Sequence, residues 1–276
     1  MNDDHHTESK LTTAALLNGA QRKIIDLSIA IENEVASDPE PFRPKITYYK
    51  HDETYHQLLP FFPGLSKKDL PDEEAWAVEE LQLGTHNGTH MDAPFHYHST
   101  MDGGDRSWTI DETPLDWCFK PGVKLDFRNF DDGYIVAASD IEAELDRIGY
   151  TLRPLDIVLV NTSAGAAFGS PQYIHKGCGM GRDATLYLTD RGVRVVGTDA
   201  WSWDAPFSHT AKKYDEIKDP AIIWEGHKAG REAAYFQMEK LSNLDVLPDC
   251  GFDVVCFPVK IKGASAGWTR AVAIVP

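Results

Sequence analysis

Uninterrupted apolar runs of strand length occur in the middle of the chain. The segment from Asp156 to Val160 contains one such run, and Val193 to Val196 forms a second that ends at Gly197-Thr198-Asp199. A strand buried on both faces is apolar at successive positions, whereas a half-exposed strand alternates between apolar and polar residues. We therefore predict that both runs form strands inside the protein.

Amphipathic segments lie beside these runs. Ser139-Asp140-Ile141-Glu142 has the form of a capping box, which opens a helix that Gly149 can close. Arg182 to Arg191 has a helical pattern, and Gly192 after it fits a helix C-cap. Because helical segments and buried strands follow one another here, the pattern favours the α/β class.

The two ends of the chain add further elements. Ile24-Ile25-Asp26-Leu27-Ser28 is predicted to be the first strand, and Phe252 to Phe257 and Ala271 to Val275 are predicted to be the last two. Residues 1–20 are expected to form a tail or a short helix. No shift in composition marks a later domain boundary, so we expect residues 21–276 to fold as one domain.

Charge and composition exclude several classes of function. The formal net charge of −16 opposes binding to nucleic acid, which requires lysine and arginine to replace counterions on the phosphates. The apolar runs are too short to cross a membrane, and the polar, acidic N-terminus does not resemble a secretory signal. These features predict a cytoplasmic protein with reduced cysteines. Cys256 lies in an apolar run and is expected to be a core residue rather than a nucleophile.

Residues that could bind a metal ion or take part in catalysis are concentrated in one short segment. From His86 to His98 the sequence reads HNGTHMDAPFHYH, so four of the 11 histidines and one aspartate fall close together. Imidazole and carboxylate groups together suit zinc, manganese or iron(II). A single histidine is more often a surface or hydrogen-bonded residue, but the cluster with Asp92 favours a divalent-metal site.

The spacing of these residues restricts their local structure. His86 and His90 have the spacing of one helical face, but Gly88 and Pro94 disfavour a continuous helix. His90 and Asp92 are separated by one residue, and in an extended chain such side chains point the same way. We therefore predict a strand-like or irregular turn that presents three ligands to one point.

The segment from His86 to His96 fits H-x-G-T-H-x-D-x-P-x-H, the signature of the metal-dependent cyclase family, which includes bacterial kynurenine formamidases and isatin hydrolase. The chain resembles this family from about residue 24 to its C-terminus, including Gly197-Thr198-Asp199 and Glu239 to Asp245. The resemblance implies a swivelling β/β/α fold with a mixed sheet and a homodimer or homotetramer. It also implies hydrolysis of an amide, lactam or lactone in a small molecule by metal-activated water.

The resemblance further implies that His86, His90 and Asp92 hold a first zinc or manganese ion, and that Asp92 bridges to a second in two-metal members. A histidine and a glutamate twelve residues later complete the second site, and His227 and Glu239 have that separation. In one unbroken helix these two residues would lie roughly 18 Å apart. The chain must therefore reverse between them, as a short helix followed by a strand. Whether one or two ions bind stays open.

Beside these ligands, the resemblance implies that His96 carries the proton from water to the leaving atom. A G-x-S-x-G nucleophile motif is absent from the sequence, which agrees with metal-based chemistry. A lyase or isomerase on the same scaffold and a non-catalytic metal-binding protein remain alternatives. The chain is longer than the small formamidases before the histidine segment, including residues 51–80, and around Trp201-Ser202-Trp203-Asp204. We expect these regions to form a pocket wall or a lid.

Overall fold

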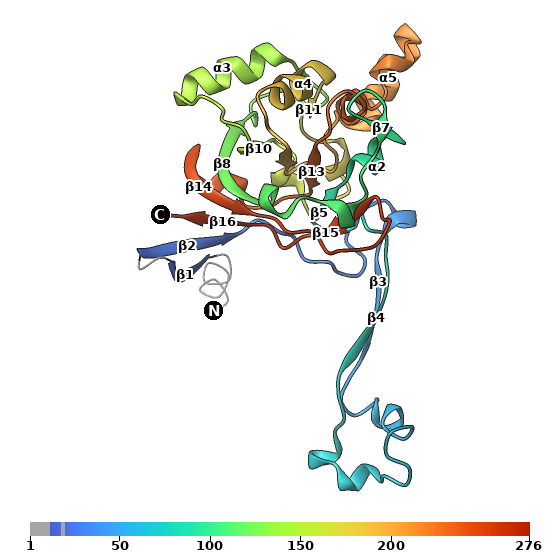
Figure 1. Cartoon of the computed structure of the whole chain (residues 1–276). Helices are drawn as coiled ribbons and strands as arrows, with labels where there is room; N and C mark the ends of the chain where they lie inside the picture. Colours follow the sequence, from blue (N-terminus) through green and yellow to red (C-terminus); the bar gives the residue numbers. More distant parts are fainter. Residues whose placement is uncertain (1–11, 18–19) are drawn as a thin grey trace, which may run out of the picture.

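The structure of the protein is a computed structural model that describes residues 12–17 and 20–276 (Figure 1). The strands are β1 (Thr12–Leu17), β2 (Ala20–Asp26), β3 (Lys45–Tyr49), β4 (Val78–Gln82), β5 (His90–Asp92), β6 (Thr100–Met101), β7 (Asp105–Arg106), β8 (Phe119–Asp126), β9 (Ile135–Val136), β10 (Ile157–Asn161), β11 (Gly179–Met180), β12 (Val195–Thr198), β13 (Phe236–Glu239), β14 (Cys250–Val255), β15 (Ala266–Trp268) and β16 (Val272–Val275). The α-helices are α2 (Pro94–Tyr97), α3 (Ala138–Ile148), α4 (Arg182–Asp190), α5 (Phe207–Ile217) and α6 (Glu225–Lys228).

One ten-stranded mixed sheet organises the body, in the order β1-β2-β16-β14-β8-β10-β12-β13-β5-β15. Four adjacent strands at the centre of the sheet run parallel to one another: β8, β10, β12 and β13. The flanking strands, from β14 to β1 on one side and β5 and β15 on the other, pair antiparallel. This arrangement confirms the α/β class and the mixed sheet.

Strand β10 is apolar at four successive positions, from Ile157 to Val160, because both of its faces are buried. In β10, Ile157 and Leu159 pack into one hydrophobic cluster. Val158 and Val160 point to the opposite face and pack into a second cluster with Ile141 of α3 and the buried face of α4. Helices α3 and α4 cover this face of the sheet in Figure 1. Each large apolar side chain that is fully buried stabilises the fold by roughly 1.5–3 kcal/mol.

Both predicted helices form. α3 closes at Gly149, whose φ of 64° is left-handed, and Gly192 after α4 has a φ of 84°. The start of α3 differs from the prediction in its capping residue. Asp140, rather than Ser139, provides the cap, because its carboxylate accepts a hydrogen bond of 2.8 Å from the Ala137 amide.

The expectation of a tail or short helix over residues 1–20 is wrong for residues 12–17. These residues form β1, which pairs antiparallel with β2 from Thr12↔Ile25 to Leu17↔Ala20. The local sequence of threonine, alanine and leucine does not decide between helix and strand, and the unpaired edge of β2 supplies the backbone partners. Residues 1–11 and 18–19 lie outside the described residues.

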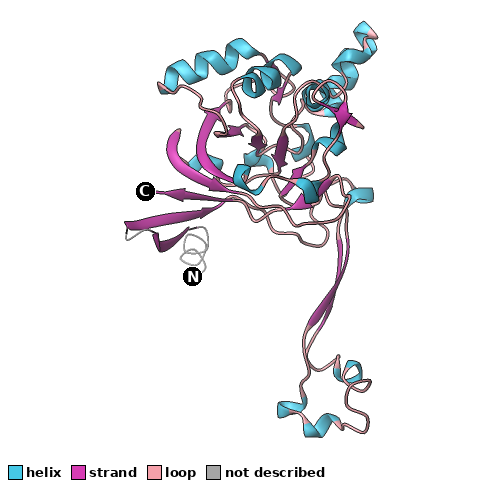
Figure 2. Cartoon of the chain, viewed as in Figure 1, coloured by secondary structure: helices cyan, strands magenta, loops and turns pink. Residues whose placement is uncertain are grey.

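A long arm extends away from the body. It consists of β3 and β4, paired antiparallel from Lys45↔Gln82 to Tyr49↔Val78, and of residues 50–77 at its far end. Figures 1 and 2 show this end as short helical turns and loops, well separated from the sheet. Residues 51–80 therefore do not form a lid over the body of their own chain. Within the described ranges, no helix is long and apolar enough to cross a membrane.

The loop from Trp203 to Ala205 packs tightly against β11. Met180 donates a backbone hydrogen bond of 2.8 Å to the Trp203 carbonyl, and a Cβ atom added to Gly179 would lie 1.7 Å from the Ala205 amide nitrogen. Backbone cannot move aside as a flexible side chain can. Only glycine therefore fits at position 179.

Replacing Gly179 with alanine should lower the free energy of unfolding by about 3 kcal/mol, at the upper end of the usual range for overpacking. Gly149→Ala is the control: it has a left-handed φ but nothing within 4 Å of the added Cβ, and it should cost only about 1–2 kcal/mol. Urea unfolding of both variants measures the difference. Equal losses would mean that the contact between β11 and the loop does not restrict residue 179.

Candidate functional site

Strand β5 fixes two of the predicted ligands. It pairs with β13 on one edge and with β15 on the other. Because side chains alternate along a strand, Met91 points into the hydrophobic core while His90 and Asp92 point together to the other face. This confirms the predicted extended geometry between His90 and Asp92.

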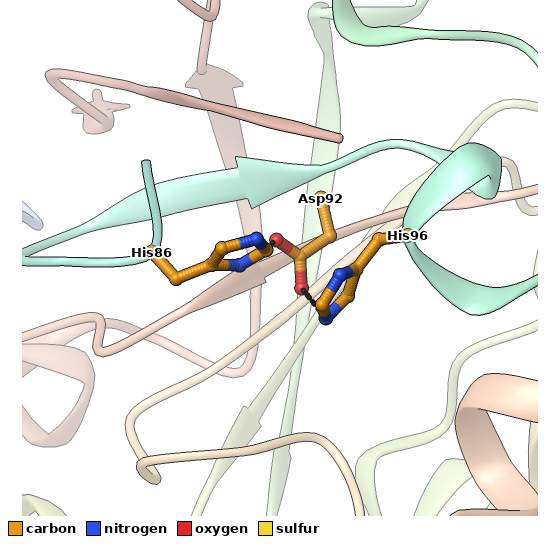
Figure 3. A group of neighbouring side chains, drawn as sticks. All are labelled: His86, Asp92 and His96. Atoms are coloured by element: carbon orange, nitrogen blue, oxygen red, sulfur yellow. Dashed lines mark ion pairs between the residues drawn. The ribbon is translucent and has the colours of Figure 1, made fainter. Parts of the chain in front are cut away.

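His86 reaches the same point from a turn that precedes β5. Gly88 within this turn has a φ of 63°, and a Cβ atom on it would lie 2.7 Å from Cγ1 of Ile31. Both conditions require glycine. The turn therefore brings His86 next to Asp92, as Figure 3 shows.

Three donor atoms converge. His86 Nδ1 lies 2.9 Å from Asp92 Oδ1 and 3.3 Å from His90 Nε2, and His90 Nε2 lies 3.3 Å from Asp92 Oδ1. Despite these distances, Asp92 Oδ1 receives no hydrogen bond of acceptable geometry from any described residue. Ligand atoms each about 2.1 Å from one zinc ion would be roughly 3.4 Å apart in a tetrahedral site. The triangle therefore fits a bound divalent ion better than a hydrogen-bonded network.

His227 and Glu239 lie on the other side of Asp92. His227 is in α6 and Glu239 ends β13, so the chain reverses between them as predicted. Glu239 lies opposite His90 in the sheet, and its Oε2 is 3.6 Å from His90 Nε2. His227 Nε2 lies 3.5 Å from Glu239 Oε1 and 3.9 Å from Asp92 Oδ2. The structure thus brings together all five residues that the sequence suggested as ligands.

His96 lies beside this group, on the short helix α2 that Pro94 begins. Its Nε2 is 3.9 Å from Asp92 Oδ2, and its ring centre is 4.1 Å from that of His86. Figure 3 shows Asp92 between His86 and His96. His86, Asp92 and His96 form one group of atoms close enough to hold a metal ion, and His90, Asp92 and Glu239 form another. By geometry alone, His96 is therefore placed for either ligation or proton transfer.

Two buried carboxylates dominate the electrostatics. Asp92 is completely buried and Glu239 is 6 % exposed. Although burial opposes ionisation, His90 and His86 hold the pKa of Asp92 well below its usual value. Burial and Asp92 also oppose ionisation of Glu239, but His227 and His90 lower its pKa. The carboxylates therefore stay charged and require positive charge around them.

The pKa values of the histidines shift in opposite directions. Burial opposes protonation of His227, but Asp204 and Glu239 raise its pKa to about 10. Burial also opposes protonation of His90, and Asp92 and Glu239 outweigh this and raise its pKa. For His96, burial together with the nearby His86 and His227 lowers the pKa to about 4. His96 is therefore a neutral imidazole at neutral pH and can accept a proton.

Hydrogen bonds on the side of the ring away from the carboxylates orient the three candidate histidine ligands. His90 Nδ1 pairs with the Gly88 carbonyl at 2.9 Å, and His227 Nδ1 pairs with Asp204. In His86 the other ring nitrogen has this role: Nε2 is hydrogen-bonded to Ser265 Oγ at 3.2 Å. In each case the other ring nitrogen faces the carboxylates, an arrangement that metal-binding histidines commonly have.

Sequence reasoning missed two polar residues of the site. Asp204 was expected only as part of a pocket wall or lid, and Gln237 was not singled out. Gln237 is completely buried, and its Nε2 lies 2.7 Å from His227 Nε2, 2.9 Å from Glu239 Oε1 and 3.3 Å from Asp92 Oδ2. The sequence does contain a signal for Gln237. It lies two residues before Glu239 on a buried strand, so both side chains point to the same face of the sheet.

A cavity of about 690 Å³ opens onto His86, His96, His227 and Glu239. Its other walls come from the root of the arm, the turn before β5, the loop after β12, helix α5, the residue before α6 and the end of β13. They comprise Asp38, Pro41, Phe42, Arg43, Lys45, Gln82, Leu83, Gly84, Asn87, Trp201, Ser202, Phe207, Trp224 and Lys240. The expected wall at Trp201-Ser202 is therefore present, and the residues before the histidine segment contribute through the root of the arm rather than its far end.

Comparison with known proteins agrees with this geometry. The sequence model of the Cyclase family matches residues 25–205. The chain belongs to the cyclase family. This cyclase is 28 % identical over 231 residues to the kynurenine formamidase of Maricaulis maris, covering 80 % of this chain and 94 % of that protein. It is 27 % identical over 202 residues to the kynurenine formamidase of Salinibacter ruber, covering 73 % and 81 %.

Solved structures share the fold of this cyclase. Isatin hydrolase A from Labrenzia aggregata, bound to benzyl benzoate, superposes with a TM-score of 0.69 at 20 % identity, over 99 % of this chain and 97 % of that one. Isatin hydrolase A from Ralstonia solanacearum also gives a TM-score of 0.69, at 21 % identity over 92 % of each chain. At this level of identity the likeness concerns the fold.

Proposed function

We propose that this cyclase is a metal-dependent hydrolase that cleaves an amide, lactam or lactone bond of a small molecule. The observation that carries the proposal is the triangle of His86 Nδ1, His90 Nε2 and Asp92 Oδ1. His86 lines a cavity large enough for a small molecule, and His90 and Asp92 are buried directly beside His86. The similarity to kynurenine formamidases supports the same reaction class.

His86, His90 and Asp92 would hold a first divalent ion, and Asp92, His227 and Glu239 would hold a second. Nitrogen and carboxylate oxygen donors suit zinc or manganese. Bound there, such an ion would polarise a carbonyl group and lower the pKa of a water molecule. The Gln237 amide, whose nitrogen approaches all three donors of the second group, would have to move before a second ion could enter.

His96 would move the proton. As a neutral imidazole beside Asp92, it can accept a proton from attacking water and return it to the leaving nitrogen or oxygen. Trp224 packs edge-on against the His96 ring at 5.0 Å and stacks on His227 at 4.3 Å. This indole restricts the orientation of His96.

Removal of metal should abolish hydrolysis. A screen of formyl-amides, lactams and lactones, run on protein loaded separately with zinc and manganese, should identify a substrate whose cleavage stops on chelation and returns with one of these ions. Elemental analysis should then give one or two ions per chain. Full activity in protein that elemental analysis shows to be free of metal would contradict the proposal.

His96→Ala should retain the bound metal and lose turnover. A positioned acid–base group contributes about 10²–10⁴-fold to the rate, so kcat should fall within that range while KM changes little. His90→Ala is the comparison, since loss of a ligand should empty the site. Metal analysis and steady-state kinetics on both variants separate the roles. If His96→Ala loses metal as well, His96 is a ligand.

We also propose that the cyclase is a homodimer or homotetramer in which the arm packs against a second copy. A two-stranded hairpin is only marginally stable in isolation, and this one carries exposed apolar side chains along its length. They are Tyr48, Leu59, Phe61, Phe62, Trp76 and Leu81, of which Phe61 is 71 % exposed. Apolar side chains gathered on a projecting element are typical of an interaction surface.

Replacing Phe61 and Phe62 together with serine should weaken the oligomer, because both side chains lie at the far end of the arm. The matched control replaces Phe119 and Phe257 with serine; both are exposed on the body, at 52 % and 45 %. Light scattering across a range of protein concentrations should show a shift towards monomer only for the arm variant. An unchanged mass for both variants, or an equal shift in both, would exclude the arm as the contact.

A further inference from the structure

A nearly buried lysine in the wall of the cavity contacts the turn that carries His86. Lys240 directly follows Glu239 at the end of β13 and is only 4 % exposed. Its Nζ donates hydrogen bonds to Asp38 Oδ1 at 2.6 Å and to the His86 carbonyl at 3.2 Å. One side chain thus connects the segment of one candidate ligand, Glu239, to the main chain of another, His86.

Asp38 gathers several segments around this ammonium group. Besides Lys240, its carboxylate accepts a hydrogen bond of 2.9 Å from Trp201 Nε1 and one of 3.4 Å from Asn87 Nδ2. The Trp201 ring centre also lies 5.3 Å from Lys240 Nζ. Asn87 is the neighbour of His86, so the network holds the histidine turn at two successive residues.

His86 is the candidate ligand that most needs such support. Its side chain is 36 % exposed, whereas His90 and Asp92 are fully buried and belong to a strand that is paired on both edges. His86 lies in a turn without strand pairing. A hydrogen bond to its carbonyl therefore restricts a main chain that the sheet does not hold.

Neither the backbone conformation of Lys240 nor the burial of its charge is expected to stabilise the fold. Its φ is 57°, in the left-handed region that residues other than glycine rarely adopt. Burying an ion pair seldom adds stability relative to apolar side chains, because desolvation opposes the attraction between the charges. Such features are retained where they fix a geometry that function requires.

We propose that Lys240 is a positioning residue for the metal centre. Held by Asp38, its ammonium group fixes the His86 turn relative to the end of β13, so that the His86 ring and the Glu239 carboxylate keep their positions on either side of Asp92, the ligand that the two proposed ions would share. The inference rests on the proposed metal-dependent function, and it predicts that Lys240 acts on ion affinity although it is not itself a ligand.

The test is the affinity of metal-stripped, folded protein for zinc, measured by competition with a chromophoric chelator. Lys240→Met should weaken binding by at least about tenfold, the lower end of the range for residues that orient metal ligands. Lys124→Met is the matched control. Lys124 is also buried, and its Nζ donates to a backbone carbonyl, that of Leu247 at 2.6 Å, away from the cavity. The zinc affinity of the Lys124→Met variant should stay within about twofold of that of the wild-type protein.

The double variant Asp38→Asn/Lys240→Met separates positioning from the effect of leaving a carboxylate unpaired. It removes both charges, and it also serves if Lys240→Met alone does not fold. Zinc binding that remains at least about tenfold weaker supports positioning. Recovery of wild-type affinity in the double variant, or equal affinities for Lys240→Met and Lys124→Met, would overturn it. Wild-type protein that binds no ion would instead defeat the proposed function itself.

Discussion

The register between β5 and β13 sets the positions of His90, Asp92 and Glu239, the three donors of the site that lie on the sheet. In this register His90 lies opposite Glu239 and Asp92 lies opposite Gln237, while Met91 between them packs into the core. A slip of one residue would turn Met91 towards the cavity and bury His90 and Asp92 among apolar side chains. Since β15 pairs with the other edge of β5, such a slip would break hydrogen bonds on both sides at once.

This register also creates the electrostatic problem that the surrounding residues answer. It places the Asp92 and Glu239 carboxylates close together in a buried position, where each raises the cost of ionising the other. Three kinds of partner offset the repulsion: imidazole rings, the Gln237 amide and, under the proposed function, a divalent ion. Asp204 extends the arrangement outward, because it orients His227 and raises its pKa. Donors that repel one another without a cation are well arranged to bind one.

Local sequence was sufficient where local rules decide the structure. Both α3 and α4 follow from their spacing and terminal glycines, and His90 and Asp92 share a face because one residue separates them. The return of the chain between His227 and Glu239 followed from distance alone. The family signature added the choice of these two residues over other histidines and glutamates.

Features that depend on contacts between residues far apart in the sequence could not be predicted from local rules. β1 forms because the edge of β2 is available, and the direction of the arm depends on how its two strands leave the body. Asp204 and Gln237 carry no motif, and the family stretch from Glu239 to Asp245 assigns no role to Lys240. Each of the three is important because of what folding places next to it. A lysine after a glutamate is ordinary in sequence; its burial against Asp38 is not.

The position of the cavity connects the site to the rest of the molecule. The sheet supplies the fixed donors, whereas His86, His96 and His227 come from a turn and short helices that packing must hold in place. The cavity wall opposite them includes Phe42 and Lys45 at the root of the arm. A substrate in the cavity would therefore touch the base of the same element whose far end presents apolar side chains to solvent. Because Lys45 and Gln82 are both a pair of the β3–β4 ladder and part of the cavity wall, the arm begins where the pocket ends.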